Sequence, residues 1–178
     1  PRALQDPGKP RAKLHIVVSA FEHPSILACA RVLEARGHEV SYVQPNREGM
    51  IRPEALKDVL RADTALVSIM YVNGEIGTVQ PLRALSQLVR KISPRAFVHT
   101  DASQAPLYLP LGLHDLGVDC MSIDAQKIYG PKGVGLLAHR RSVPLANILY
   151  GGSQEGGLRP GTTPVTLAVG LATALSHA

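Results

Sequence analysis

The sequence contains no tryptophan, and aromatic residues make up only 4% of its 178 residues. Nucleic-acid-binding surfaces combine basic side chains with aromatic rings on which bases stack, and no segment here has that combination. The formal net charge of +5 is also unevenly placed: residues 1–13 hold four basic side chains and one acidic one, which leaves 15 basic and 13 acidic side chains elsewhere. Since the remainder is nearly balanced in charge, we expect no nucleic-acid partner.

Long apolar runs and paired cysteines are missing as well. No apolar stretch reaches the roughly 18 residues that a membrane span requires, so we expect no membrane partner. The two cysteines, Cys29 and Cys120, lie far apart and have no partner at the spacing of a metal or redox site. This usage suits a reducing compartment, and it predicts a cytoplasmic protein without a metal site in which both thiols are buried by packing.

What the chain does contain is a regular alternation of apolar runs and helical patterns. Such alternation is typical of βα units that build a mostly parallel sheet, and it predicts an α/β fold with a three-layer αβα sandwich. Strands are predicted over 14–18, 40–43, 65–70, 96–99, 118–123 and 134–138, and helices over 25–35, 53–60, 82–92 and 165–175. We expect a basic, Pro-rich leader or linker over 1–12 and one incomplete large domain over 13–178.

Three side chains near predicted strand ends have complementary chemistry. Asp101 and Gln104 follow the strand over 96–99, and Lys127 follows the strand over 118–123. The Tyr-Gly-Pro turn over 129–131 would hold the Lys127 side chain inward. In open α/β sheets, ligands bind outside the carboxyl ends of the strands. An amine could form a Schiff base with pyridoxal phosphate, a carboxylate could keep the pyridine nitrogen protonated, and an amide could bond the phenolic oxygen. The pattern therefore predicts a pyridoxal-phosphate site.

Five segments resemble the cysteine desulfurases and selenocysteine lyases, which are class V members of the aminotransferase-like superfamily. The segments are Ser-Ala-Phe-Glu-His-Pro (19–24), Met-Tyr-Val-Asn-Gly-Glu-Ile-Gly-Thr (70–78), His-Thr-Asp-Ala-Ser-Gln-Ala (99–105), Ser-Ile-Asp-Ala-Gln-Lys-Ile-Tyr-Gly-Pro-Lys-Gly (122–133), and Gly-Gly-Ser-Gln-Glu (151–155) with Arg-Pro-Gly-Thr (159–162). Their order and spacing are those of the family. The resemblance implies the large domain of a fold type I pyridoxal-phosphate enzyme.

The resemblance also implies roles for individual residues. Lys127 and His23 would be catalytic, with the His23 ring stacked over the pyridine ring. Thr162 would reach the cofactor phosphate of a neighbouring subunit in a homodimer. The remaining cofactor-binding positions that it implies are Asn73, Asp101, Gln104, Asp124 and Gln126.

Three positions depart from the pattern of most relatives. Gly74 replaces an asparagine that contacts the cofactor ring, and Gly156 replaces an arginine of the glycine-rich loop. Asp124 replaces a hydroxyl that donates a hydrogen bond to the phosphate. An ionised Asp124 cannot donate, so we expect it to turn away, to be protonated or to face a compensating donor; Gln126 can still donate through its amide.

The chain lacks the family's upstream phosphate loop, its downstream loop with the nucleophilic cysteine, and its substrate-binding arginine. We therefore expect a fragment of a cysteine desulfurase, which converts cysteine to alanine and passes sulfur to a cysteine persulfide for iron–sulfur cluster supply, with a sulfur-acceptor or scaffold protein as a partner. The isolated chain should be inactive. Two alternatives stay open: another class V enzyme, such as a selenocysteine lyase or an aminotransferase, and a non-catalytic domain that uses the fold for partner binding.

Overall fold

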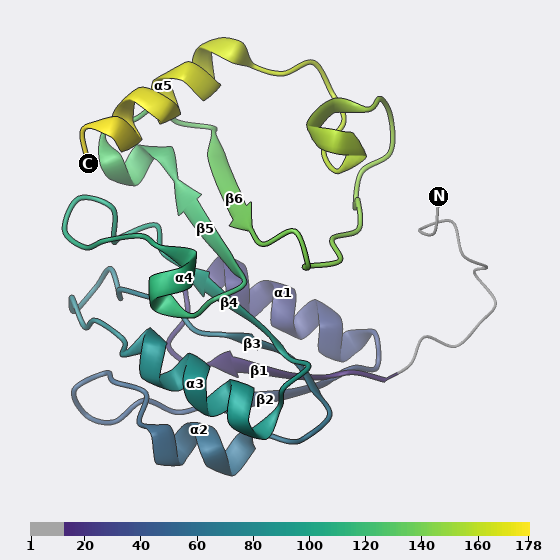
Figure 1. Ribbon diagram of the computed structural model, residues 1–178, viewed down its shortest axis with the longest axis vertical. Helices are drawn as coiled ribbons and strands as arrows, with labels where there is room; N and C mark the ends of the chain where they lie inside the picture. The colour runs from purple at the N-terminus through teal and green to yellow at the C-terminus, as the bar shows by residue number, and fades with distance from the viewer. Residues whose placement is uncertain (1–12) are drawn as a thin grey trace.

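Short strands alternate with helices in the computed structural model, which describes residues 13–178 (Figure 1). The strands are β1 (His15–Ser19), β2 (Glu39–Val43), β3 (Thr64–Ser68), β4 (Phe97–Asp101), β5 (Cys120–Asp124) and β6 (Gly135–His139). The helices are α1 (Pro24–Ala35), α2 (Pro53–Val59), α3 (Leu82–Ile92), α4 (Leu113–Leu116) and α5 (Val165–Ser176), with 3₁₀ turns η2 (Ala125–Ile128) and η3 (Gln154–Gly157).

The strands form one sheet in the order β2-β1-β3-β4-β5-β6. Neighbouring strands from β2 to β5 are parallel, and β6 pairs with β5 in the antiparallel sense. Parallel neighbours need crossover connections, and the helices between the strands provide them. The predicted α/β class, with helices on both faces of a mostly parallel sheet, is confirmed.

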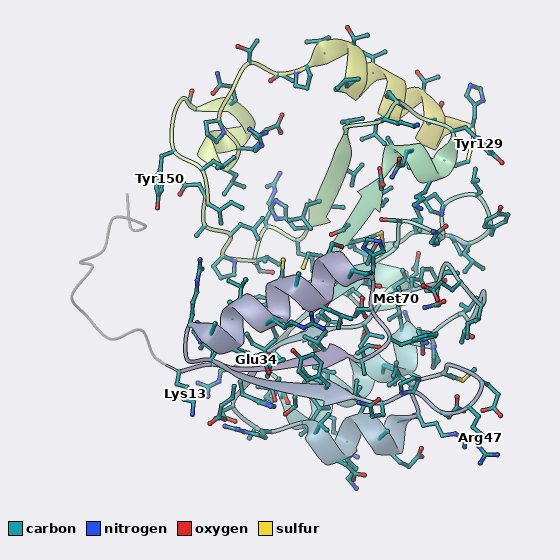
Figure 2. The ribbon with its side chains drawn as sticks, turned by 180° about the vertical axis from the view of Figure 1, so that it is seen from behind. Lys13, Glu34, Arg47, Met70, Tyr129 and Tyr150 are labelled. Atoms are coloured by element: carbon teal, nitrogen blue, oxygen red, sulfur yellow. The ribbon has the colours of Figure 1, made fainter. Side chains whose placement is uncertain are left out.

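The two faces of the sheet bury different sets of side chains, because successive residues of a strand point to opposite faces. Val17 lies in the larger core, under α2, α3 and α4, together with Leu56 of α2 and Leu85 of α3. Its neighbours Ile16 and Val18 point the other way and pack under α1. Figure 2 shows α1 lying across this second face, with Lys13 near one end of the sheet and Met70 near the other.

Several strands extend further into polar sequence than their apolar runs predict. β4 continues to Asp101, which pairs with Ser122 of β5, and β5 continues to Asp124, which pairs with Gly135 of β6. The sequence pattern did not predict α4 or the 3₁₀ turns, which are too short to show a periodicity.

The two cysteines differ in exposure. Cys120 is buried on β5, as predicted, but the prediction that Cys29 is buried is wrong, because this thiol is exposed on α1. The helix packs on the sheet through Ile26, Ala30 and Leu33, and Cys29 lies at the flank of that apolar stripe.

The predicted leader over 1–12 lies outside the described residues. Within residues 13–178, no helix combines the length and the apolar character that crossing a membrane requires.

Candidate functional site

A cavity of about 710 Å³ opens at the carboxyl ends of the parallel strands. The loops after β1, β3, β4 and β5 line it, together with the segment that leads into β6. Seven of the eight predicted site residues are among its lining residues: His23, Asn73, Asp101, Gln104, Asp124, Gln126 and Lys127. The eighth, Thr162, is exposed in the loop between η3 and α5 and does not line the cavity.

Asp101 is the last residue of β4, so the sheet fixes its backbone. Its Oδ1 accepts a hydrogen bond from the Ser103 N–H at 2.9 Å, and within the described residues its Oδ2 accepts none. The Gln104 side chain lies over Gly74, where an added Cβ would come within 2.6 Å of Gln104 Nε2. The absence of a side chain at Gly74 therefore gives the Gln104 amide its place in the cavity.

Lys127 stands on the 3₁₀ turn η2 directly after β5. Ala125 and Ile128 anchor this turn, because both are buried against Leu171 of α5. Tyr129 then adopts the left-handed conformation with φ 61°, and the turn closes there. The Lys127 side chain lines the cavity but is exposed to solvent, which corrects the expectation that the turn holds it inward, and its amine forms no ion pair with any described residue.

Asp124 and Gln126 form hydrogen bonds with each other. The Asp124 carboxylate accepts hydrogen bonds from the Gln126 N–H at 3.2 Å and from Gln126 Nε2 at 2.9 Å. Asp124 thereby caps η2, and Gln126 acts as a compensating donor, which is one of the three outcomes expected for Asp124. One consequence is that the Gln126 amide is engaged by a carboxylate instead of pointing freely into the cavity.

Asn73 is only 5% exposed and uses its side chain within its own loop. Its Oδ1 accepts from the N–H groups of Glu75 and Ile76, and its Nδ2 donates to the Phe21 carbonyl at 3.4 Å. These bonds fix the turn that presents Gly74 to Gln104.

His23 is the N-cap residue of α1, and its ring Nδ1 lies 2.8 Å from Ser25 Oγ and 3.3 Å from the Ser25 N–H. These contacts hold the imidazole at the rim of the cavity, while Nε2 forms no hydrogen bond with the described residues. The ring is thus both a helix cap and a side chain of the cavity wall.

Glu22 is the lining residue whose importance the sequence did not reveal. Its side chain is 6% exposed, and burial raises its pKa to about 8. A carboxyl immediately before a site histidine is visible in the sequence, but only the fold shows that it is buried.

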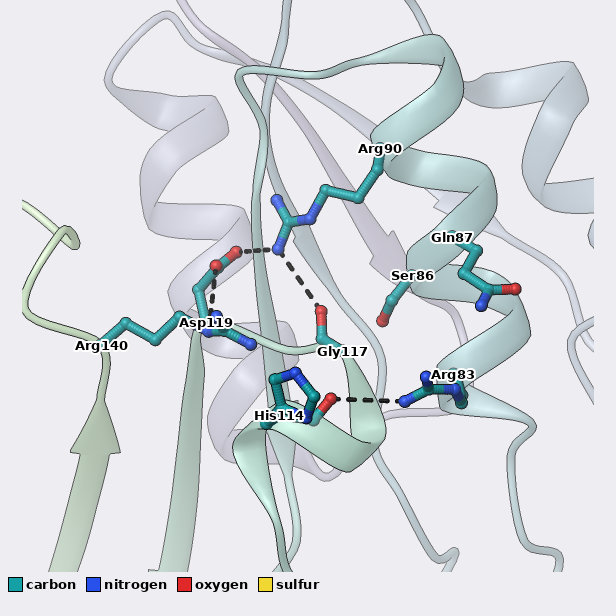
Figure 3. A pocket seen from close by; sticks show the side chains of 8 residues that line it. All are labelled: Arg83, Ser86, Gln87, Arg90, His114, Gly117, Asp119 and Arg140. Atoms are coloured by element: carbon teal, nitrogen blue, oxygen red, sulfur yellow. Dashed lines mark hydrogen bonds and ion pairs between the residues drawn. The ribbon is translucent and has the colours of Figure 1, made fainter.

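A second cavity, of about 300 Å³, lies between α3, α4 and the start of β5 (Figure 3). Arg90 donates to Asp119 Oδ2 at 2.5 Å and to the Ala96 carbonyl at 2.6 Å, and Arg140 donates to the Val118 carbonyl at 3.0 Å. Because these guanidinium groups are engaged by Asp119 and by main-chain carbonyls, they tie α3 and the end of β6 to the segments that lead into β4 and β5. None of the predicted site residues lies here.

Fold and site together define an open α/β protein that gathers an amine, a carboxylate and an amide around one cavity at the carboxyl ends of its strands. The family model for aminotransferase class-V proteins matches residues 2–178. The chain belongs to that family.

Proteins with established names agree with this assignment. The chain is 41% identical over 176 residues to a cysteine desulfurase IscS of Dictyoglomus turgidum, covering 99% of this chain and 43% of that protein. It is 44% identical over 164 residues to a probable mitochondrial cysteine desulfurase of Dictyostelium discoideum, covering 91% of this chain and 36% of that protein. The chain thus spans less than half the length of these relatives.

Solved structures show the same relation. A NifS-like protein matches with a TM-score of 0.91 and 38% identity, over 94% of this chain and 46% of that one. The structure described as SspA in complex with cysteine matches with a TM-score of 0.89 and 36% identity, over 94% of this chain and 48% of that one. This likeness confirms the predicted fold class and the resemblance to cysteine desulfurases.

Proposed function

We propose that this chain is the pyridoxal-phosphate-binding part of a cysteine desulfurase. The observation that carries the proposal is that Asp101, Gln104 and Lys127, which come from two different strand-end loops, line the same cavity. The names of the relatives support the activity, and the SspA structure with cysteine supports the substrate.

The polar groups of the cavity fit this cofactor. Within the described residues, Asp101 Oδ2, the Gln104 amide and the Lys127 amine form no hydrogen bond or ion pair, so all three have capacity left for a ligand. A cavity of about 710 Å³ falls within the usual range for small-molecule sites, which is roughly 300–1,000 Å³. Asp101 would hold the pyridine nitrogen, Gln104 the phenolic oxygen, and Lys127 the aldehyde carbon.

When bound, pyridoxal phosphate supplies an electron sink for the negative charge that develops at the substrate α-carbon. Asp101 would keep the proton on the ring nitrogen, because a carboxylate held at the end of β4 favours the positively charged form of the pyridine ring. The Lys127 amine takes the α-proton of the amino acid and returns a proton later. The His23 imidazole is available to stack over the pyridine ring, and its Nε2, which has no described partner, is available to carry a proton at the rim of the cavity.

Gln126 of η2 would lie beside the phosphate end of the cofactor. The Asp124 carboxylate is a poor neighbour for a phosphate, since like charges repel, but the donation from Gln126 Nε2 partly offsets its charge. Asn73 would contribute indirectly to cofactor binding, because it fixes the turn at Gly74 against which the Gln104 amide lies.

In the reaction that we propose, cysteine and an enzyme thiol give alanine and an enzyme persulfide. The bond from sulfur to the β-carbon breaks, the sulfur bonds to the enzyme thiolate, and a proton replaces it on the β-carbon. Cys120 does not suit this role, because burial raises the pKa of its thiol to about 11. Cys29 does not line the cavity. The persulfide cysteine is therefore expected in the parent protein, by which we mean the natural protein that contains this sequence, outside residues 1–178.

We further infer that the parent protein is a homodimer that supplies sulfur for iron–sulfur clusters, with a sulfur-acceptor or scaffold protein as its partner. Thr162 lies away from the cavity of its own chain, which agrees with a role in the site of a neighbouring subunit. A cytoplasmic location remains part of this proposal.

The test is turnover of cysteine by the parent protein in the presence of pyridoxal phosphate and a thiol reductant. We expect alanine and sulfide in equal amounts, loss of both with Lys127→Ala, and retention of both with Lys132→Ala. Residues 1–178 alone should release no sulfide above the background of free cofactor. Formation of pyruvate and ammonia in place of alanine, or full activity of Lys127→Ala, would show that the proposed reaction is wrong.

A further inference from the structure

Glu22 is a buried carboxyl in the wall of the candidate site with half of its hydrogen-bonding capacity unused. The residue is 6% exposed and lines the same cavity as His23 and Asp101. Its Oε1 accepts a hydrogen bond from the Met70 N–H at 2.5 Å. Its Oε2 is buried and has no partner among the described residues.

The Met70 bond joins two loops that come from different strands. Glu22 lies between the end of β1 and His23, the N-cap residue of α1, whereas Met70 lies two residues beyond the end of β3. The Asn73 side chain strengthens the same junction, because its Nδ2 lies 3.4 Å from the Phe21 carbonyl and 3.5 Å from Met70 Sδ. Glu22 thereby fixes the loop that places the His23 ring at the rim of the cavity.

The surroundings of Glu22 disfavour its ionised form. Burial is the main cause that raises the pKa of Glu22 to about 8, the Met70 N–H opposes this shift, and the negative charge of Asp101 adds to it. The other ionisable groups that line the cavity are His23, Glu75, Asp101, Asp124 and Lys127. At neutral pH the Glu22 carboxyl is therefore mostly protonated, and Asp101 faces the cavity without a second negative charge beside it.

We propose that Glu22 is a positioning residue of the site: a neutral carboxylic acid that holds the His23 loop against the end of β3 and adds no second negative charge beside Asp101. Ionisation of Glu22 would strengthen the Met70 bond but would place an unpaired buried charge near Asp101, and the cost of that charge opposes this arrangement. The consequence for cofactor binding rests on the proposed function, whereas the protonation and the loop contact do not.

Infrared spectroscopy tests the protonation directly and independently of any activity. In the parent protein prepared without cofactor and labelled with ¹³C-glutamate, we expect the carbonyl stretch of a protonated acid at pH 6.5 and its loss with a midpoint near pH 8. The band should be absent in Glu22→Gln and retained in Glu75→Gln, which changes an exposed carboxyl of the same cavity. If the unsubstituted protein shows no such band, the proposal is wrong whether or not the variants fold.

Binding of pyridoxal phosphate tests the positioning role. Glu22→Gln keeps an acceptor for the Met70 N–H without a titrating group, so its dissociation constant at pH 7 should stay within about threefold of the unsubstituted protein. Between pH 7 and pH 9 the unsubstituted protein should lose about tenfold in affinity relative to Glu22→Gln, since only about one-tenth of Glu22 stays protonated one pH unit above its pKa.

Glu22→Leu, which removes the acceptor, should bind the cofactor more weakly than Glu22→Gln at every pH. Identical pH dependence of the unsubstituted protein and Glu22→Gln, with the infrared band present, would overturn the positioning role. Failure of all three proteins to bind pyridoxal phosphate would instead contradict the proposed function and leave the infrared result to decide the protonation.

Discussion

The two ends of the sheet use polar residues in opposite ways. At the amino ends of the strands, buried ionisable side chains are paired: Asp119 with Arg90, and His15 with Thr64 and Ser41, the latter at 2.8 and 3.0 Å. At the carboxyl ends, several polar atoms that face the cavity have no described partner. Buried polar groups are normally satisfied, and exceptions concentrate at functional sites. The difference supports the proposal that the carboxyl end binds a ligand, whereas the paired groups of the amino end hold the fold together.

The largest effect that this comparison predicts is on the chemistry at the carboxyl end. Asp101→Ala in the parent protein should reduce the rate of alanine formation by ~30- to 1,000-fold, because loss of a charge-assisted contact in the transition state costs about 2–4 kcal/mol. Cofactor affinity should fall much less, since the lysine and the phosphate contacts share the binding. Steady-state kinetics at saturating cofactor measure this, and a rate within threefold of the unsubstituted enzyme would show that Asp101 does not hold the ring nitrogen.

A smaller effect, and of a different kind, is predicted for the amino end. Asp119 accepts from the Val98 N–H at 2.7 Å as well as from Arg90, so Asp119→Ala leaves a main-chain donor and a guanidinium without their partner. We expect a loss of about 2–3 kcal/mol in the free energy of unfolding, which is below the full cost for a buried pair because the arginine is partly exposed. Urea denaturation measures the loss.

The folded fraction of Asp119→Ala should keep its rate of alanine formation. The matched control is Asp63→Ala, which removes an exposed partner of Arg61 and should lower the free energy of unfolding far less than Asp119→Ala does. A large fall in rate for Asp119→Ala, with stability unchanged, would reverse the roles assigned to the two ends.

Much of this division was predictable from the sequence, because parallel strands place their carboxyl ends at one edge. The apolar runs before Asp101 and Lys127 were enough to predict that both side chains reach the same cavity. What could not be predicted depends on side-chain packing across loops. The bond from Gln126 to Asp124 requires the 3₁₀ turn, and the burial of Glu22 requires the loop after β3 to cover it.

The errors have the same origin. Cys29 fits the apolar pattern of α1 in the sequence, yet its exposure depends on which flank of the helix other elements cover. Lys127 follows a buried strand, yet its side chain is exposed because η2 places it at the cavity wall. A sequence pattern gives the face of an element, whereas the exposure of a single side chain depends on its neighbours in space.

The most direct test of the central claim is to identify the lysine that holds the cofactor. The parent protein is incubated with pyridoxal phosphate, its visible absorption is recorded, and borohydride then fixes the cofactor before peptide mapping. We expect an absorption band in the visible region and a label on Lys127 that is lost in Lys127→Ala and kept in Lys132→Ala. A label on Lys132, or no label while Lys127 is intact, would contradict the assignment of the carboxyl end of the sheet as the cofactor site.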